Sequence, residues 1–513
     1  MDMLQPLIGG IGQLADPWIW FFVAIGTVIG VIAGALPGLG TTMTYGMVLP
    51  FTFVMSPVHA VAFLLSISVG QGYGNSIPAI LMGVPGSPSA VLTVIDGHIM
   101  HKQGDSGFAL GISFVAALGG QLVSIVFFVM LVVPLMYMAY SFLYPELFSL
   151  YLLGVIAIIS LTGANMVKGL IAAGFGLLIS LVGLDPINLT TRFTFDYRIL
   201  RSGVDMTAVL IGLLAVSELL RSARQVFRWE AGIDDAAARS RFPSFKRLLP
   251  TFPAMAGGTV IGTLVGAIPG AGATPAAMIS YQFAQLFSRE PQKFGHGSPE
   301  GIAANEAAQN ASNSGELIPT FGLGIPGSSS MVLLLAALTV HGFVPGPMMI
   351  RNDPQLFYAA ISGMLAATIL LLLTGWSMAT LMLKAVNLNR SVVLILSLAT
   401  VILGVYSLNT RIFDVYVMLA AGVVGYVMQR YGYSTAAAAL ACTLGGELES
   451  SLRLGLNLVD GDWVRFVTRP ITATVLLTIA GLLIYGVRRT RRMRRQLAAF
   501  HAAEAATAAK GTG

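Results

Sequence analysis

Apolar residues run through this chain in long blocks that charged residues rarely interrupt. Residues 107–145, 252–288 and 317–350 contain no Asp, Glu, Lys or Arg. Each run exceeds the roughly 20 residues that an α-helix needs to cross the hydrocarbon core of a bilayer. The pattern predicts an all-α polytopic membrane protein. Spans are expected near residues 18–36, 58–72, 108–134, 146–162, 166–183, 206–220, 252–268, 330–344, 356–384, 391–406, 412–428 and 470–487, with half-spans near 42–55, 77–92, 274–287 and 434–446.

The chain also contains an internal repeat. Residues 26–42 read GTVIGVIAGALPGLGTT and residues 258–274 read GTVIGTLVGAIPGAGAT, with 11 of 17 positions identical at an offset of 232. Residues 74–92 read GNSIPAILMGVPGSPSAVL and residues 315–333 read GELIPTFGLGIPGSSSMVL, with 10 of 19 identical at an offset of 241. Two matched motifs in the same order indicate a duplication rather than a chance likeness of glycine-rich helices.

Proline and glycine interrupt the apolar blocks at matched places in the two halves. The PGxG motifs start at Pro37 and Pro269, and the second pair of interruptions spans residues 83–87 and 324–330. Proline lacks a backbone donor and glycine weakens a helix, so we expect helices to break there. Broken backbone is tolerated in a membrane only where protein buries it or where it lines a polar cavity. The pattern therefore predicts discontinuous helices, re-entrant hairpins and a binding site between the halves.

Charge places the halves across the membrane. Charged residues make up 10% of the chain, against about 25% in soluble proteins, and the first 101 residues contain no Lys or Arg. Basic residues gather in the segment 221–250 and in the tail 488–513. Because cytoplasmic loops are rich in Lys and Arg, the halves are expected to enter from opposite sides, as an inverted repeat. The expected parts are a first half at 1–220, the basic cytoplasmic loop at 221–250, a second half with additional C-terminal spans at 251–487, and the basic tail.

The interruptions suggest the class of ligand. A half-helix N-terminus presents free N–H groups and the positive end of the helix dipole, which favour an anion such as a carboxylate. Nearby hydroxyl groups add donors. The alternative is that these small residues only let helices pack closely. The substrate-binding candidates are Gly38, Gly40, Thr41, Thr42, Gly86, Ser87, Ser89, Gly270, Gly272, Thr274, Gly327, Ser328, Ser329 and Ser330.

A polar segment, residues 299–316, lies between two apolar regions. Glu306, Asn310 and Asn313 share one helical face by their spacing, with Asn305 beside them. Amide and carboxylate oxygens suit Na⁺, and a carboxylate can carry a proton instead. A solvated loop is the equal alternative. Asn75 is expected to play a parallel role in the first half, whereas Asp96-Gly97-His98, near His101 and Lys102, is interpreted as an ordinary polar turn.

The chain lacks the signatures of other classes. There is one cysteine, Cys442, and no HExxH, CxxC, GxSxG, Walker A or Rossmann motif. A carrier is therefore favoured over a membrane-embedded enzyme, which would need a convergent catalytic set. A passive channel remains the other alternative.

Three runs carry a resemblance to a known family. GALPGLGTTMTYGMVLPFTF, GQGYGNSIPAILMGVPGSPSAVLTVIDGHIM and the long block at 295–347 resemble the large membrane subunit of the tripartite tricarboxylate transporter family, over roughly residues 15–490. The resemblance implies a multi-pass protein of the bacterial inner membrane that works with a periplasmic solute-binding protein and a small membrane subunit. It further implies uptake of citrate or related carboxylates, driven by a Na⁺ or H⁺ gradient, with no cofactor.

Overall fold

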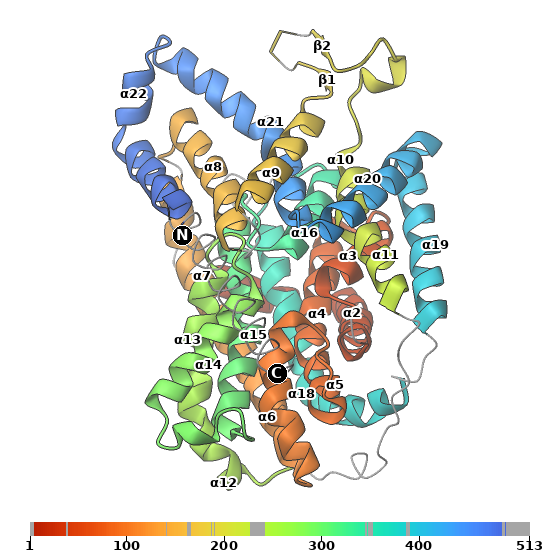
Figure 1. The fold of residues 1–513 in the computed structure, drawn as a ribbon, viewed down its shortest axis with the longest axis vertical. Helices are drawn as coiled ribbons and strands as arrows, with labels where there is room; N and C mark the ends of the chain where they lie inside the picture. The colour runs from red at the N-terminus through yellow and green to blue at the C-terminus, as the bar shows by residue number, and fades with distance from the viewer. Residues whose placement is uncertain are drawn as a thin grey trace, which may run out of the picture. The chain divides into compact units, whose positions relative to one another are not determined.

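The computed structural model describes residues 5–36, 39–139, 141–161, 166–185, 187–188, 190–225, 242–343, 346, 352–385, 390–484 and 488. Gly38, most of the basic loop and nearly all of the basic tail lie outside these ranges. The described chain is mostly helical (Figure 1). Within it, six helical segments are long and apolar enough to cross a membrane: Pro17–Ala35, Ser106–Ala139, Met206–Ala223, Phe245–Gly266, Pro354–Ala379 and Ile412–Arg430.

The chain divides into two compact units. The first contains Met1–Ser141 and Val182–Val427, and the second contains Phe142–Leu181 and Met428–Gly513. The helices of the first unit are α1 (Gln5–Gln13), α2 (Pro17–Ala35), α3 (Thr41–Thr52), α4 (Pro57–Gly74), α5 (Ser76–Met82), α6 (Val91–Lys102), α7 (Ser106–Ala139), α10 (Met206–Leu210), α11 (Ser217–Gln225), α12 (Phe245–Leu248), α13 (Phe252–Gly266), α14 (Ala273–Phe287), α15 (Pro299–Leu323), α16 (Ser329–Val340), α18 (Pro354–Ala385), α19 (Arg390–Asn409) and α20 (Ile412–Arg430), which ends just past the boundary.

The prediction of an all-helical chain is wrong at one place in the first unit. The strands β1 (Gly183–Leu184) and β2 (Thr191–Arg192) pair antiparallel, with Gly183 opposite Arg192. The Asp185 side chain accepts hydrogen bonds from the backbone N–H groups of Ile187 and Asn188 and also pairs with Arg192. This carboxylate closes the turn, so a short hairpin forms where the sequence offered only a loop.

The second unit is built from α8 (Tyr144–Leu161), α9 (Met166–Ser180), α21 (Thr435–Leu458) and the short α22 (Trp463–Thr468). Helix α21 packs against both α8 and α9. A Cβ atom added at Gly176 would lie 2.1 Å from the carbonyl oxygen of Ala438, so α9 and α21 approach through backbone. The buried Glu146 carboxylate accepts from Arg469 Nε at 2.5 Å.

Two helix pairs of the first unit pack through matched glycines. Helix α2 packs against α4, and α13 packs against α15. A Cβ added at Gly30 would lie 2.3 Å from the carbonyl oxygen of Ile67, and one at Gly262 would lie 2.4 Å from that of Ala308. Small residues at such positions let membrane helices approach closely. The same contact to a backbone carbonyl recurs at Gly26 with Phe63, at Gly34 with Gln71, at Gly258 with Ala304 and at Gly266 with Ser312.

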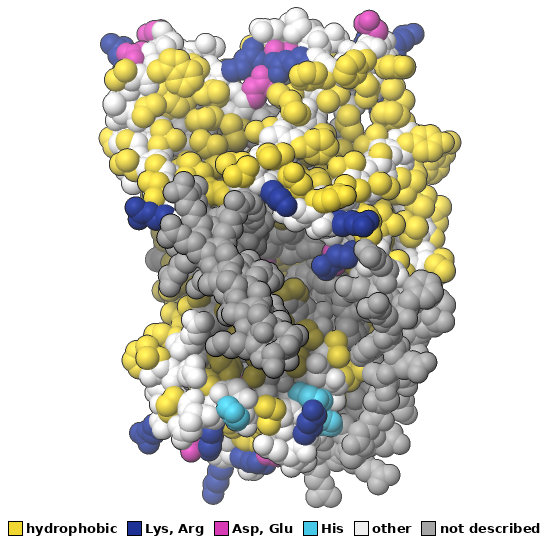
Figure 2. Space-filling model, in the orientation of Figure 1, with side chains coloured by type: hydrophobic (Ala, Val, Ile, Leu, Met, Phe, Trp, Pro, Cys, Tyr) yellow, Lys and Arg dark blue, Asp and Glu magenta, His cyan; other side chains and the backbone are white. Residues whose placement is uncertain are grey.

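Each half of this core also packs a long helix on the other half. Helix α7 lies against α15, and α18 lies against α4. Backbone contact is again close: a Cβ at Gly120 would lie 2.5 Å from the Ala307 carbonyl oxygen, and one at Gly363 would lie 2.6 Å from the Ala62 Cα. Apolar side chains such as Leu264, Leu286 and Phe287 face outward, and hydrophobic side chains cover much of the surface drawn in Figure 2.

The interpretation of Asp96-Gly97-His98 as a polar turn is wrong, because these residues lie within α6. Asp96 is fully buried. Its Oδ1 accepts from the backbone N–H groups of Gly295, Gly297 and Ser298, each at 2.9 Å, and its Oδ2 accepts from the Tyr281 hydroxyl at 2.7 Å. The carboxylate thus ties α6 to the loop that begins α15.

Gly120→Leu should destabilise the protein strongly. The new side chain would overlap the α15 backbone, and overpacking of this kind costs about 1–3 kcal/mol or more. Gly119 is the matched control, since it is exposed and nothing lies within 4 Å of an added Cβ. Thermal unfolding in detergent should show a lower midpoint for Gly120→Leu and an unchanged one for Gly119→Leu. Equal midpoints would contradict this packing.

Asp96→Ala should destabilise far more than Asp105→Ala. The first substitution leaves three backbone donors without their acceptor, at about 1–3 kcal/mol each. The second removes only a half-exposed pair with Arg247, which is worth about 0–1 kcal/mol. The decrease in the thermal unfolding midpoint of each variant measures this destabilisation. A larger decrease for Asp105→Ala than for Asp96→Ala would refute the role given to Asp96.

Candidate functional site

The helices end at the predicted interruptions, and matched glycines end them in the same way. Gly83 follows α5 with φ 67°, and Gly324 follows α15 with φ 73°. The next backbone N–H then reaches back to a proline carbonyl, from Val84 to Pro78 at 3.3 Å and from Ile325 to Pro319 at 3.1 Å. This is the glycine-terminated helix end in which a left-handed residue satisfies the last free carbonyls. We call residues 36, 39, 40 and 83–90 the first break, and residues 267–272 and 324–330 the second break.

The helices that start at the breaks begin without side-chain caps. Helices α3, α14 and α16 follow Gly40, Gly272 and Ser328, and none of these residues caps the helix through its side chain. An uncapped N-terminus has N–H groups available for a ligand and the positive end of the dipole. These ends therefore suit an anion.

The ends of the longer helices away from the breaks are capped instead. Asp16, Ser56 and Ser298 accept backbone hydrogen bonds at the starts of α2, α4 and α15. His59 Nε2 lies 3.0 Å from Asp16 Oδ2, and this hydrogen bond holds the pKa of Asp16 below its usual range. Helix α13, whose N-terminus also lies away from the breaks, has no side-chain cap, so capping distinguishes α2, α4 and α15 from the half-helices but does not by itself mark the breaks.

Paired hydroxyl groups lie at both breaks. Ser87 Oγ is 2.8 Å from Ser89 Oγ, and Ser328 Oγ is 2.9 Å from Ser330 Oγ. Ser89 and Ser330 are buried. The remaining hydroxyl candidates stand in the first turns of the half-helices and are half-buried: Thr41 and Thr42 in α3, Thr274 in α14 and Ser329 in α16.

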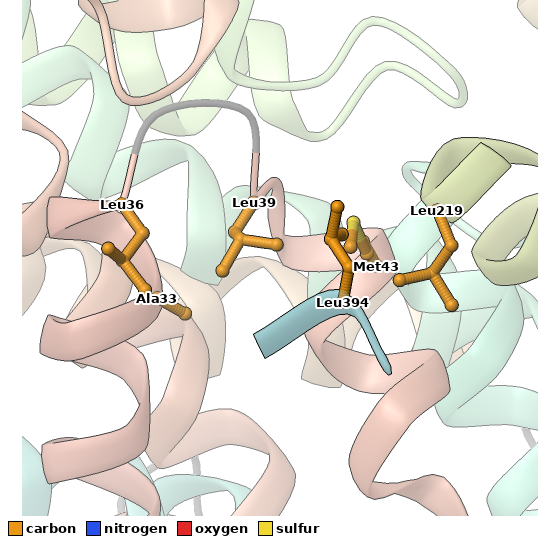
Figure 3. Close-up of a cluster of buried hydrophobic side chains, with 6 residues drawn as sticks. All are labelled: Ala33, Leu36, Leu39, Met43, Leu219 and Leu394. Atoms are coloured by element: carbon orange, nitrogen blue, oxygen red, sulfur yellow. The ribbon is translucent and has the colours of Figure 1, made fainter. Parts of the chain in front are cut away.

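The first break is anchored by one polar and one apolar contact. Gln71 Nε2, on α4, donates to the Leu39 carbonyl oxygen at 2.5 Å. Leu36 and Leu39 flank the loop and join a buried cluster with Met43 of α3 (Figure 3). Leu219 of α11 and Leu394 of α19 complete this cluster with Ala33.

The second break is held by its own backbone. The Gly270 N–H donates to the Gly327 carbonyl at 2.8 Å, which joins residues 267–272 to residues 324–328. The Gly327 N–H donates to Thr320 Oγ1 at 3.1 Å. Gly270 and Gly272 have φ of 78° and 68°, which glycine adopts without strain.

The motif glycines divide between the two roles that the sequence left open. A Cβ at Gly86 would lie 2.5 Å from the Gly34 carbonyl oxygen, and one at Gly327 would lie 2.5 Å from the Glu316 carbonyl oxygen. These two glycines serve close packing. Among the described residues, nothing lies within 4 Å of such an atom at Gly40, and the nearest atom at Gly272 is 3.8 Å away. Space is therefore left beside the N-termini of α3 and α14.

The polar segment 299–316 forms most of α15 and is not a solvated loop. Glu306 is fully buried and accepts from Ser76 Oγ at 2.5 Å and from Thr93 Oγ1. Asn305, also buried, donates to Thr93 Oγ1 at 2.7 Å. Asn310 Nδ2 donates to the Glu306 carbonyl of its own helix at 3.0 Å. The structure thus brings Glu306 and Asn305 to η1–α6 (η1, Pro88–Ala90) and to α5.

Two amides cross between α4 and α15 at matched positions. Gln309 Nε2 donates to the Gly72 carbonyl at 2.9 Å, and Asn313 Nδ2 donates to the Ser68 carbonyl at 3.5 Å. By the offset of 241, position 309 matches 68 and position 313 matches 72. The contact between Gln309 and Gly72 therefore corresponds to the contact between Ser68 and Asn313 when the two halves are exchanged. Asn75, at the end of α4, is buried, and its Oδ1 has no hydrogen-bond partner among the described residues.

Sequence reasoning missed several residues of these breaks, above all Glu316. This carboxylate is 5% exposed, and its Oε2 accepts from Ser328 Oγ at 2.5 Å. Glu316 aligns with Asn75 of the first half. Because Asn75 was already a candidate, the repeat alignment could have identified Glu316 as well. Gln71, Ser76 and Thr93 were also missed. Within the described residues, no group of three His, Cys, Asp or Glu side chains could hold a metal ion.

Comparison with known proteins places the chain. Residues 20–440 match the Tripartite tricarboxylate transporter TctA family. The uncharacterized 52.8 kDa protein in the TAR-I ttuC′ 3′ region of Agrobacterium vitis is 34% identical over 482 residues, covering 93% of this chain and 94% of that protein. An uncharacterized protein in the TAR-II ttuC′ 3′ region of the same organism is 35% identical over 215 residues, covering 42% of this chain and 89% of that protein.

No solved structure matches the chain. The family match includes both breaks and all of α15, and it identifies a transmembrane transporter rather than an enzyme. The chain belongs to the tripartite tricarboxylate transporter TctA family, whose members are the large membrane subunits of these systems.

Proposed function

We propose that this chain translocates tricarboxylates or related small carboxylates across the bacterial inner membrane, driven by a Na⁺ or H⁺ gradient. A periplasmic solute-binding protein would deliver the substrate, and a small membrane subunit would accompany the chain. Family membership supports this assembly. No cofactor enters the proposal beyond the coupling ion.

One observation carries the proposal: uncapped half-helix N-termini stand beside open space. Gly40 and Gly272 precede α3 and α14. Among the described residues, no atom lies within 4 Å of a Cβ added at Gly40, and the nearest atom to one added at Gly272 is 3.8 Å away. Free N–H groups and helix dipoles bind carboxylates without fixed cations. Thr41, Thr42 and Thr274 would add hydroxyl donors there, and Ser87 and Ser89 would do so at the first break.

The same site is proposed to lie between inverted repeats with re-entrant hairpins. The matched glycine contacts of α2–α4 and α13–α15 support a duplication, and so do the crossed amides of Gln309 and Asn313. The Lys/Arg-free start of the first half and the basic loop before the second support opposite orientations. In transporters built this way, rocking of one repeat against the other exposes a central site to each side in turn.

Ion coupling is proposed to act through the polar face of α15. Glu306 and Glu316 are both at least nine-tenths buried, and neither forms an ion pair among the described residues. A buried carboxylate without a basic partner is costly in a membrane unless a proton or a cation neutralises it. Asn75, Asn305, Asn310 and Asn313 remain candidates for supporting ligands of the coupling ion.

Counterflow tests the transport function. Proteoliposomes that contain the chain and its small subunit, with the solute-binding protein outside, should exchange labelled external citrate for unlabelled internal citrate. Exchange requires a site that reorients, so neither an enzyme nor a passive channel would accumulate label transiently. A panel of mono-, di- and tricarboxylates would define the substrate class. Absence of counterflow for every carboxylate in the panel would reject the proposal.

Gly40→Leu should abolish uptake while leaving stability unchanged. The backbone at Gly40 has φ −70°, which any residue adopts, and the added side chain would enter open space. It would therefore fill the proposed site without overlapping the fold. Gly119→Leu, in the lipid-facing surface of α7, is the control for an added leucine. Uptake rates and unfolding midpoints should separate the two, and wild-type uptake by Gly40→Leu would remove the first break from the substrate site.

A further inference from the structure

We propose that the second break holds a Na⁺ site centred on the Glu316 carboxylate, so that the two breaks bind ligands of opposite charge. The inference rests on the transport function proposed above, and it names the ion and its place. It moves the second-break candidates from the substrate to the cation and leaves the substrate anion to the first break; the candidates moved are Gly270, Gly272, Thr274, Gly327, Ser328, Ser329 and Ser330. It also removes Glu306 from the coupling-ion candidates.

Glu316 has the surroundings of an incomplete cation site. Its side chain is 5% exposed, and its Oε2 accepts from Ser328 Oγ at 2.5 Å. Its Oε1 has no hydrogen bond among the described residues, and no Lys, Arg or His there pairs with the carboxylate. This free oxygen faces the glycine break, because it lies 3.8 Å from where a Cβ of Gly272 would stand. A buried carboxylate without a basic partner is neutralised either by a proton or by a bound cation.

The hydroxyl groups linked to the Glu316 carboxylate are hard oxygen ligands, which Na⁺ prefers. Ser328 Oγ and Ser330 Oγ lie 2.9 Å apart, and Ser328 Oγ donates to the Glu316 carboxylate. The two hydroxyl groups and the carboxylate therefore form one chain of hydrogen bonds. Helices α13 and α15 both end at this break, and the last carbonyls of a helix carry its negative end. Unwound carbonyls and half-helix C-termini coordinate Na⁺ in other secondary transporters.

Glu306 differs from Glu316 in a way that makes it a poor ion site. Both of its carboxylate oxygens accept hydroxyl hydrogen bonds, one from Ser76 and the other from Thr93. These bonds join α15 to α5 and α6. We therefore assign Glu306 to holding these helices together, and not to binding the ion.

The first break has no negative charge at the matching position. Asn75 stands where Glu316 stands, and Ser87 and Ser89 match Ser328 and Ser330 by the offset of 241. At the second break, the chain's own carboxylate already sits at the N-terminus of α16, so a substrate carboxylate there would meet a like charge. A neutral amide leaves the first break open to an anion.

This arrangement couples the two ligands through charge. With Na⁺ at Glu316, the second break is neutral, and the substrate anion gains from the added positive charge. Without Na⁺, the anion enters a core in which the Glu316 carboxylate, like that of Glu306, has no ion-pair partner among the described residues. Each ligand then raises the affinity for the other by the same factor, as linkage requires.

Na⁺-dependent stability of the purified full chain tests the site without partners or substrate. Thermal unfolding in detergent should shift upward as NaCl replaces choline chloride at constant ionic strength, because a ligand that binds only the folded state stabilises it. Glu316→Gln should abolish this shift. Ser328→Ala should weaken the affinity for Na⁺ by about tenfold, since it removes one hydroxyl ligand worth about 1.4 kcal/mol.

Two further variants make the result specific. Glu306→Gln should keep the Na⁺-dependent shift even if its midpoint in choline chloride is lower. Asp105→Asn, which removes an exposed carboxylate, should behave as wild type. Binding of ²²Na⁺ to the same preparations gives a second readout that does not depend on unfolding, and Glu316→Asp provides a carboxylate variant if Glu316→Gln fails to fold.

Several outcomes would overturn the proposal. They are an unchanged Na⁺ shift in Glu316→Gln, loss of the shift only in Glu306→Gln, or a wild-type chain whose midpoint responds to pH but not to Na⁺. Loss of Na⁺ binding in Glu316→Gln, combined with no carboxylate uptake by the complete complex, would instead reject the proposed transport function while keeping the cation site.

Discussion

A backbone that breaks within a buried helical core must find its hydrogen-bond partners within the protein, and this requirement governs both breaks. The left-handed glycines at 83 and 324 return N–H groups to the carbonyls of Pro78 and Pro319. The supporting helices must then approach within backbone contact, which the glycines of α2 and α13 allow. Tight packing and open binding space are therefore neighbouring parts of one arrangement.

The two halves use the same backbone for different chemistry. Their helix ends, hydroxyl pairs and glycine contacts correspond position by position, yet Asn75 is neutral where Glu316 is acidic. In the proposed assignment, one carboxylate reverses the ligand preference of one of two similar helix breaks, because in a buried site a single charge outweighs the partial charges of a helix end.

The sequence predicted the helical membrane class and the places where the helices end. It left the segment 299–316 open between an ion-binding helix face and a solvated loop. Proline and glycine determine helix ends through local chemistry, so positions such as Gly83 and Gly324 could be predicted. Which glycines pack and which leave space could not, because Gly40 and Gly86 look alike until the neighbouring helix is placed. Asp96 was misassigned for the same reason: its three backbone donors lie about 200 residues away, at Gly295, Gly297 and Ser298. The β1–β2 hairpin could not be predicted from the sequence, because strands of two residues show no alternation of apolar and polar residues.

The crossed packing of α7 on α15 has a consequence for biogenesis. Gln121, in the middle of α7, donates to Ser314 of α15, a partner that the ribosome makes 193 residues later. During that interval the amide of Gln121 sits in an inserted helix whose natural acceptor does not yet exist. Until α15 is made, the helices of the first half therefore remain in the bilayer with a polar surface on α7, at Gln121, that has no partner helix; we call this surface the polar seam. Assembly of the core becomes a late event, completed only when α15 enters and closes the seam.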